Sequence, residues 1–128
     1  MIYLDSSTAL AHLLGEDRLP TSALWSERVV SSRLLQYELW NRIHARGYAQ
    51  SHGDRVEALL DRVSLIELAP PVLARALKPF PVPVRTLDGL HLATIEFLRA
   101  RRDDVELASY DRRLVEAART LGVAIYPL

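Results

Sequence analysis

Short apolar runs alternate along the chain with longer segments in which apolar residues recur every three or four positions. The short runs are typical of buried strands, and the longer segments are typical of amphipathic helices. The expected strands are IYL ending at Asp5, Val29–Val30, 65–68, 105–109 and 123–128. The expected helices cover about 8–14, 33–45, 51–63, 86–100 and 112–122, with a short one after Pro70 and Pro71.

Capping and breaking residues support these limits. Ser6 and Ser7 can cap the first helix, Gly15 can end it, and Thr86 can cap the helix over 86–100. The stretch KPFPVPV carries three prolines, so we expect a loop there. Strands alternating with helices predict an α/β fold with a mostly parallel sheet between two helical layers. We expect four to five strands and a single domain over 1–128.

Composition excludes several classes of protein. The 128 residues are 49% hydrophobic and 25% charged, which is an ordinary globular balance. No apolar run reaches the roughly eighteen residues of a membrane span, and MIYLDSS lacks the basic start of a signal peptide. The absence of cysteine removes disulfides, thiolate metal sites and a cysteine nucleophile. These features fit a cytoplasmic protein.

Charge argues against a module that only binds nucleic acid. The formal net charge is +0, whereas sequence-independent binders usually carry a basic excess that neutralises phosphates. Among the basic residues only Lys78 is lysine and the others are arginine. Arginine suits bidentate contacts to phosphate or carboxylate, although GC-rich codon usage explains the same bias.

Four acidic residues stand out by their positions. Asp5 and Asp111 follow expected strands, and ligands of open α/β sheets bind at the carboxyl ends of strands. Glu38 and Asp88 lie within otherwise apolar helical segments, where a carboxylate is costly unless it is paired, hydrogen-bonded or bound to a metal. We therefore expect the four side chains to share one site.

Four clustered carboxylates would repel one another without a cation. Mg²⁺ or Mn²⁺ prefers oxygen ligands and keeps several of its waters. Such an ion can activate a water toward phosphorus, and a second ion can stabilise the leaving oxygen. The residues thus favour metal-dependent phosphodiester hydrolysis.

Each acid also has a structural interpretation of its own. Asp5 could cap a helix, Glu38 could pair with Arg42 one turn later, and Asp88 could neutralise the start of its helix. Asp111 could be an N-cap alone, and it is the weakest member of the set.

Four segments in order resemble a PIN domain, specifically the VapC toxins of bacterial toxin–antitoxin pairs. The segments are IYLDSSTAL, LLQYELWNRI, RTLDGLHLATI and LASYDRRLVEAARTLGV, and the resemblance covers nearly the whole chain. It implies a three-layer αβα fold, ribonuclease activity on RNA, a cognate antitoxin that blocks the site, and a homodimer.

The resemblance also implies roles for particular residues. Asp5 and Asp88 would bind Mg²⁺ or Mn²⁺ directly, and Glu38 directly or through water. Asp111 and Ser109 would support a second ion or order waters, and the Ser7 hydroxyl could point into the site.

Other polar and aromatic residues keep two interpretations. His91 could support the site, although a packed or surface-bonded histidine is the simpler view. Arg42 and Arg46 could line a groove for RNA or form a solvated helix face. Arg112 and Arg113 could contact phosphate or an antitoxin. Three aromatic residues fit core or dimer contacts better than platforms for base stacking: Trp25, Tyr37 and Trp40.

Other enzyme classes fit less well. A receiver domain or a haloacid-dehalogenase-type phosphatase needs further acids near Asp5, where Ser6 and Ser7 stand. G-x-S-x-G and P-loop motifs are absent. Two alternatives remain open: a catalytically silent domain that binds a protein or RNA, and a nuclease that cuts DNA.

Overall fold

A five-stranded parallel sheet forms the centre of the molecule in the computed structural model, which describes residues 1–128. The strand order is β3-β2-β1-β4-β5, and every neighbouring pair is parallel. The strands are β1 Ile2–Leu4, β2 Val29–Ser32, β3 Ser64–Ile66, β4 Glu106–Ala108 and β5 Ala124–Ile125. The all-parallel pairing and the five strands confirm the fold class expected from the sequence.

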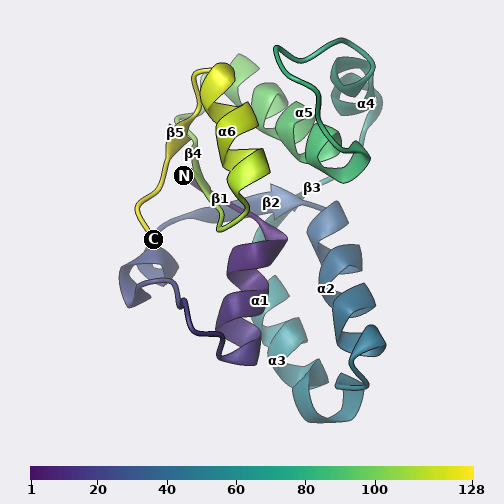
Figure 1. Cartoon of the computed structure of the whole chain (residues 1–128), viewed down its shortest axis with the longest axis vertical. Coiled ribbons are helices and arrows are strands. Elements are labelled where there is room, and N and C mark those ends of the chain that lie inside the picture. The colour runs from purple at the N-terminus through teal and green to yellow at the C-terminus, as the bar shows by residue number, and fades with distance from the viewer.

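Helices cover both faces of this sheet. They are α1 Ser6–Leu14, α2 Leu34–Ala45, α3 Ala49–Asp61, α4 Pro70–Ala76, α5 Thr86–Ala100 and α6 Arg112–Thr120, with a short 3₁₀ helix over Ser22–Ser26. Figure 1 shows α1, α2 and α3 on one side of the sheet and α5 and α6 on the other, with α4 beside α5. The architecture is therefore the expected three-layer one. No helix combines the length and apolarity needed to cross a membrane.

The alternation of side chains along β1 divides the core in two. Ile2 and Leu4 pack into an apolar cluster with residues of α1, α2 and α3. Tyr3 points the other way, into a cluster with residues of α5 and α6. Successive strand residues face opposite sides of a sheet, so one three-residue strand contributes to both cores.

The topology creates a crevice at the end of β1. The chain runs from β1 to β2 and β3 on one side, then crosses through α4 and α5 to β4 on the other side. A reversal of strand order leaves an opening at the carboxyl ends of the two strands beside it. Asp5 follows β1, and Ser109 follows β4, so both lie at this opening.

Several boundaries differ from the expected ones. Helix α1 begins at Ser6 and not near Thr8, because Asp5 itself is the N-cap and accepts the backbone N–H of Ser7. Thr86 lies inside α5, and the cap position is held by Arg85 without a side-chain hydrogen bond. Strands β3, β4 and β5 are shorter or shifted, and α3 begins two residues early.

Two predicted breaks are confirmed. Gly15 ends α1 in the left-handed conformation, with φ 62°, and its N–H donates to the Ala11 carbonyl. The proline-rich stretch connects α4 to α5 without any strand.

Candidate active site

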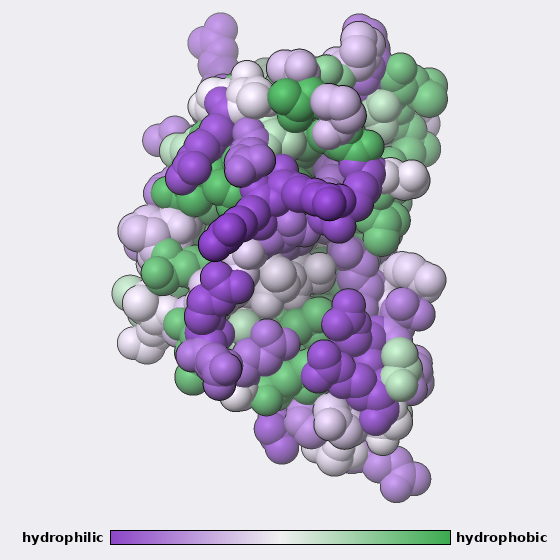
Figure 2. Space-filling model, viewed as in Figure 1, coloured by the Kyte–Doolittle hydropathy of each residue, from purple (hydrophilic) through white to green (hydrophobic).

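The four acidic side chains singled out in the sequence line one cavity. This acidic pocket has a volume of about 360 Å³, and its walls include Asp5, Glu38, Asp88 and Asp111 together with Arg85. The acids come from the end of β1, from α2, from α5 and from the turn before α6. Figure 2 shows strongly hydrophilic side chains gathered across the middle of this face of the molecule. The expected convergence is therefore present in the fold.

Asp5 is held by neutral donors. Its Oδ2 accepts the Ser7 hydroxyl at 2.6 Å, the Ser109 hydroxyl at 2.8 Å and the Ser7 backbone N–H at 3.3 Å. Its Oδ1 makes no hydrogen bond in the structure. The side chain is buried, so these three bonds offset the cost of removing its charge from water. One oxygen of Asp5 is fixed and the other remains free to bind a cation.

Glu38 of α2 is held by a histidine of α5, from the other side of the sheet. Its Oε1 lies 2.5 Å from His91 Nε2, and its Oε2 accepts the Ser6 hydroxyl at 3.2 Å. His91 Nδ1 lies 2.7 Å from the Tyr3 hydroxyl, and the imidazole is buried. Burial lowers the pKa of His91, but Glu38, Asp5 and Asp88 outweigh that effect and raise it overall. Glu38 therefore pairs with His91, and the surface pair with Arg42 is not formed.

Asp111 is the N-cap of α6. Its Oδ1 accepts the backbone N–H groups of Arg113 at 3.0 Å and Leu114 at 3.3 Å. The turn before it is fixed because the backbone N–H of Asp111 donates to Ser109 Oγ at 2.9 Å. Asp111 is thus an N-cap, as its structural interpretation expected. This role uses Oδ1 and leaves Oδ2 for a partner in the pocket.

Arg85 joins the remaining two carboxylates. Its Nε donates to Asp88 Oδ2 at 3.0 Å, and an Nη donates to Asp111 Oδ2 at 2.7 Å. Burial raises the pKa of Asp88, as do Asp111 and Asp5, while Arg85 lowers it; the net direction is upward. A guanidinium thus supplies positive charge to this side of the pocket.

The comparisons with known proteins agree with this arrangement. The family model described as the PIN domain matches residues 2–120. The chain belongs to the PIN-domain family. Ribonuclease VapC46 of Mycobacterium tuberculosis (strain ATCC 25618 / H37Rv) is 36% identical over 97% of this chain and 95% of its own length. Ribonuclease VapC47 of Mycobacterium tuberculosis (strain CDC 1551 / Oshkosh) is 30% identical over 95% of this chain and 93% of its own length. The chain is therefore a VapC-like PIN domain.

The oxygen atoms that line the acidic pocket of this PIN domain are of the kind that binds a hard divalent cation, but their present arrangement does not surround one. Four carboxylates and three serine hydroxyls supply oxygen ligands of the kind that Mg²⁺ and Mn²⁺ prefer. No three of the His, Asp and Glu side chains are grouped closely enough to hold an ion, and Arg85 pairs with two of the carboxylates. The Arg85 side chain is 54% exposed, so it can turn away into solvent.

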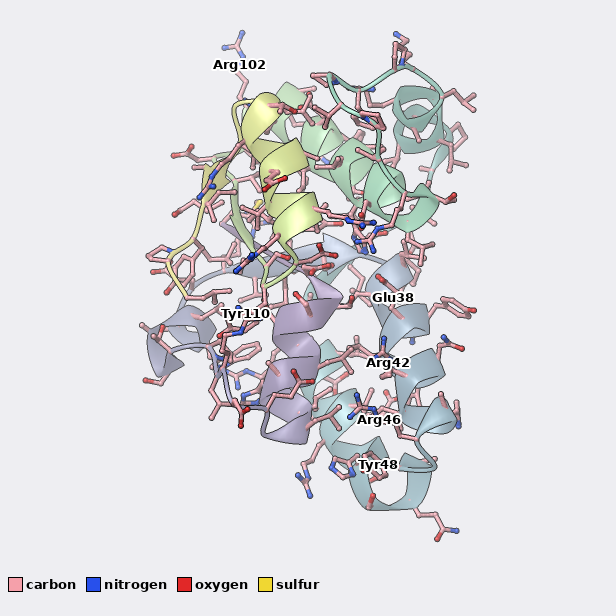
Figure 3. The ribbon with its side chains drawn as sticks, viewed as in Figure 1. Glu38, Arg42, Arg46, Tyr48, Arg102 and Tyr110 are labelled. Carbon is pink, nitrogen blue, oxygen red and sulfur yellow. The ribbon has the colours of Figure 1, made fainter.

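The arginines considered as substrate contacts differ in position. Arg42 on α2 lines the acidic pocket. Figure 3 shows Arg46 one turn further along α2, and neither arginine forms an ion pair with an acid. Arg112 and Arg113 are exposed at the start of α6. Among the aromatic candidates, Trp25 and Trp40 pack against the core, while Tyr37 is 62% exposed.

Sequence reasoning overlooked Arg85 and undervalued His91. Arg85 lies three residues before Asp88 on one helical edge, a spacing that can signal an ion pair. His91 gave a weaker signal, since its partners Tyr3 and Glu38 are distant in sequence. His91 is a packed, buried histidine, as one of its two interpretations expected, and it also contacts the site residue Glu38.

Proposed function

We propose that the protein is a Mg²⁺-dependent endoribonuclease and the toxin of a toxin–antitoxin pair. The observation that carries this proposal is the meeting of four carboxylates from four segments in one pocket at the strand ends. Membership of the PIN family and similarity to relatives named ribonucleases support the same reaction.

Asp5, Glu38, Asp88 and Asp111 would hold Mg²⁺ or Mn²⁺. A bound ion supplies activation of water and neutralisation of charge at the phosphate. Ser7 and Ser109 orient Asp5, while His91 and Ser6 orient Glu38. Substituting residues that orient metal ligands in this way commonly lowers metal affinity or activity by about 10- to 100-fold.

The remaining parts of the proposal concern partners. Arg42 at the pocket wall is suited to contact RNA phosphates, and the exposed Arg46 and Arg112 are proposed as further contacts to RNA or an antitoxin. We also propose a homodimer and a cytoplasmic location, where RNA and a cognate antitoxin protein would meet the enzyme.

Asp5→Asn tests the reaction. It preserves the size of the side chain and removes its charge, so we expect RNA cleavage in Mg²⁺ to fall by about 100-fold or more. Cleavage of a labelled RNA is compared with DNA of the same sequence, with and without EDTA, and growth inhibition is measured in parallel. The matched control is Asp54→Asn, because Asp54 is exposed on α3 away from the pocket.

The outcomes separate the competing functions. Full cleavage by Asp5→Asn, or cleavage unaffected by EDTA, would contradict metal catalysis at this pocket. Equal cleavage of DNA would contradict the ribonuclease assignment. A wild-type protein that cleaves nothing, yet binds RNA or a partner protein, would favour the silent binding module.

A further inference from the structure

A second cavity opens beside the acidic pocket. It has a volume of about 660 Å³, and we call it the tyrosine pocket because Tyr110 and Arg18 form part of its wall. It shares Asp5, Asp111 and Arg42 with the acidic pocket. Figure 3 shows Tyr110 on the side of α1 opposite Glu38 and Arg42. The two cavities are therefore continuous, and the carboxylates of Asp5 and Asp111 lie where they meet.

Tyr110 is anchored to the carboxylate site through its backbone. Its N–H donates to Ser7 Oγ at 3.0 Å, and the same hydroxyl donates to Asp5 Oδ2 at 2.6 Å. The neighbouring residues Ser109 and Asp111 are themselves site residues. The backbone of Tyr110 is consequently fixed relative to Asp5, and its ring forms part of the pocket wall beside the carboxylates.

One face of the Tyr110 ring lies against an exposed arginine. The Arg18 guanidinium lies over the ring, 4.9 Å from its centroid. Arg18 is exposed and forms no ion pair, so this contact is easily opened. Aromatic rings and guanidinium planes are the two surfaces on which proteins stack unpaired bases.

Charge decides which part of a nucleotide fits this pocket. Glu16 and Asp17 also line it, and their carboxylates repel a phosphate. A neutral base suffers no such repulsion. The sugar–phosphate chain is attracted instead to Arg42, which lines both cavities.

We propose that Tyr110 and Arg18 bind the base of a nucleotide next to the scissile phosphate, with the base inserted between ring and guanidinium. This inference rests on the proposed ribonuclease function and makes Tyr110 a substrate-positioning residue. The site requires an unpaired nucleotide, because a base within a duplex offers no free face.

Binding of RNA in EDTA tests this subsite independently of cleavage. The probe is a fluorescein-labelled single-stranded RNA of random sequence, followed by fluorescence anisotropy. We expect Tyr110→Ala to weaken binding by about tenfold or more, the scale of losing one stacked base. Tyr110→Phe keeps the ring and should stay within about threefold of wild type. The matched control is Tyr37→Ala, which removes an exposed ring from α2 and should change nothing.

Two further variants separate stacking from charge and folding. Arg18→Ala removes both the charge and the planar guanidinium, and we expect it to weaken RNA binding. Arg18→Lys keeps the charge but lacks the planar guanidinium, so we expect it to weaken RNA binding to a similar extent. Tyr110→Trp retains a stacking surface, and its added emission should be quenched by the RNA relative to wild type. That signal keeps the test decisive if Tyr110→Ala does not fold.

Three results would overturn the subsite. They are unchanged RNA binding by Tyr110→Ala, an equal loss for Tyr110→Phe, and an equal loss of binding to duplex RNA. If Tyr110→Ala impairs only a complex with an antitoxin protein, the surface serves that partner and the proposal is wrong. If RNA binding behaves as expected but wild type never cleaves RNA in Mg²⁺, the subsite survives and the proposed reaction fails.

Discussion

The two sides of the acidic pocket stabilise their carboxylates by different means. On the first side, Asp5 and Glu38 accept hydrogen bonds from serine hydroxyls and from a buried histidine. On the second side, Asp88 and Asp111 share the guanidinium of Arg85, which is half exposed. The donors on the first side are buried or partly buried side chains. On the second side, one oxygen of Asp111 is held by backbone N–H groups of α6, and the oxygens that Asp88 and Asp111 turn to Arg85 share one half-exposed side chain.

This difference implies that the first side is preorganised and the second is adjustable. Short, buried hydrogen bonds hold an oxygen in one place, while an exposed ion pair contributes little and exchanges readily with solvent. Cation binding would leave Asp5 and Glu38 where they are and would displace Arg85. The following experiments test the contrast, from the largest expected effect to the smallest.

His91→Ala should have the largest effect on stability. It removes the partner of the buried Tyr3 hydroxyl and of Glu38 and leaves a cavity between α5 and β1. We expect the free energy of unfolding to fall by about 2–4 kcal/mol. Urea denaturation measures it. The contrast is Arg85→Ala on the second side, which should cost less than about 1 kcal/mol. Similar losses for the two variants would contradict the difference in rigidity.

The sequence was sufficient for the fold and for the meeting of the four acids. Strand and helix periods are local signals, and Asp5 and Asp111 could be placed because parallel strands end at a common edge. The carboxylates in helical segments were visible as exceptions among apolar neighbours. Their roles in catalysis remain predictions.

The partners of these acids were harder to foresee. Arg85 reaches Asp111 across 26 positions, and His91 reaches Glu38 across 53. Periodicity says which face a residue occupies but not which side chain of another element it meets. The start of α1 was misplaced for a local reason, since the N-cap is Asp5 and not Ser6 or Ser7.

Ser109→Ala should have an intermediate effect, because Ser109 contacts both Asp5 on the first side and the backbone of Asp111 on the second. The Ser109 hydroxyl donates to Asp5 Oδ2 and accepts the Asp111 N–H, so its loss frees both carboxylates to move. We expect affinity for Mn²⁺, measured by isothermal titration calorimetry, to fall by about tenfold. Ser109→Thr keeps the hydroxyl and should restore most of it. A loss that threonine does not rescue would point to packing instead of the hydrogen bond.

Arg85→Gln should have the smallest effect, and its sign is the most informative. If Arg85 competes with a cation for Asp88 and Asp111, removing its charge should tighten Mn²⁺ binding by about fivefold. The control is Arg112→Gln, which changes net charge equally but removes an arginine without an ion pair, and which should leave affinity within about twofold of wild type. Weaker binding by Arg85→Gln would mean that the guanidinium organises the two acids for the ion, so that both sides of the pocket are preorganised. Tighter binding would instead make Arg85 the cation that the metal must replace.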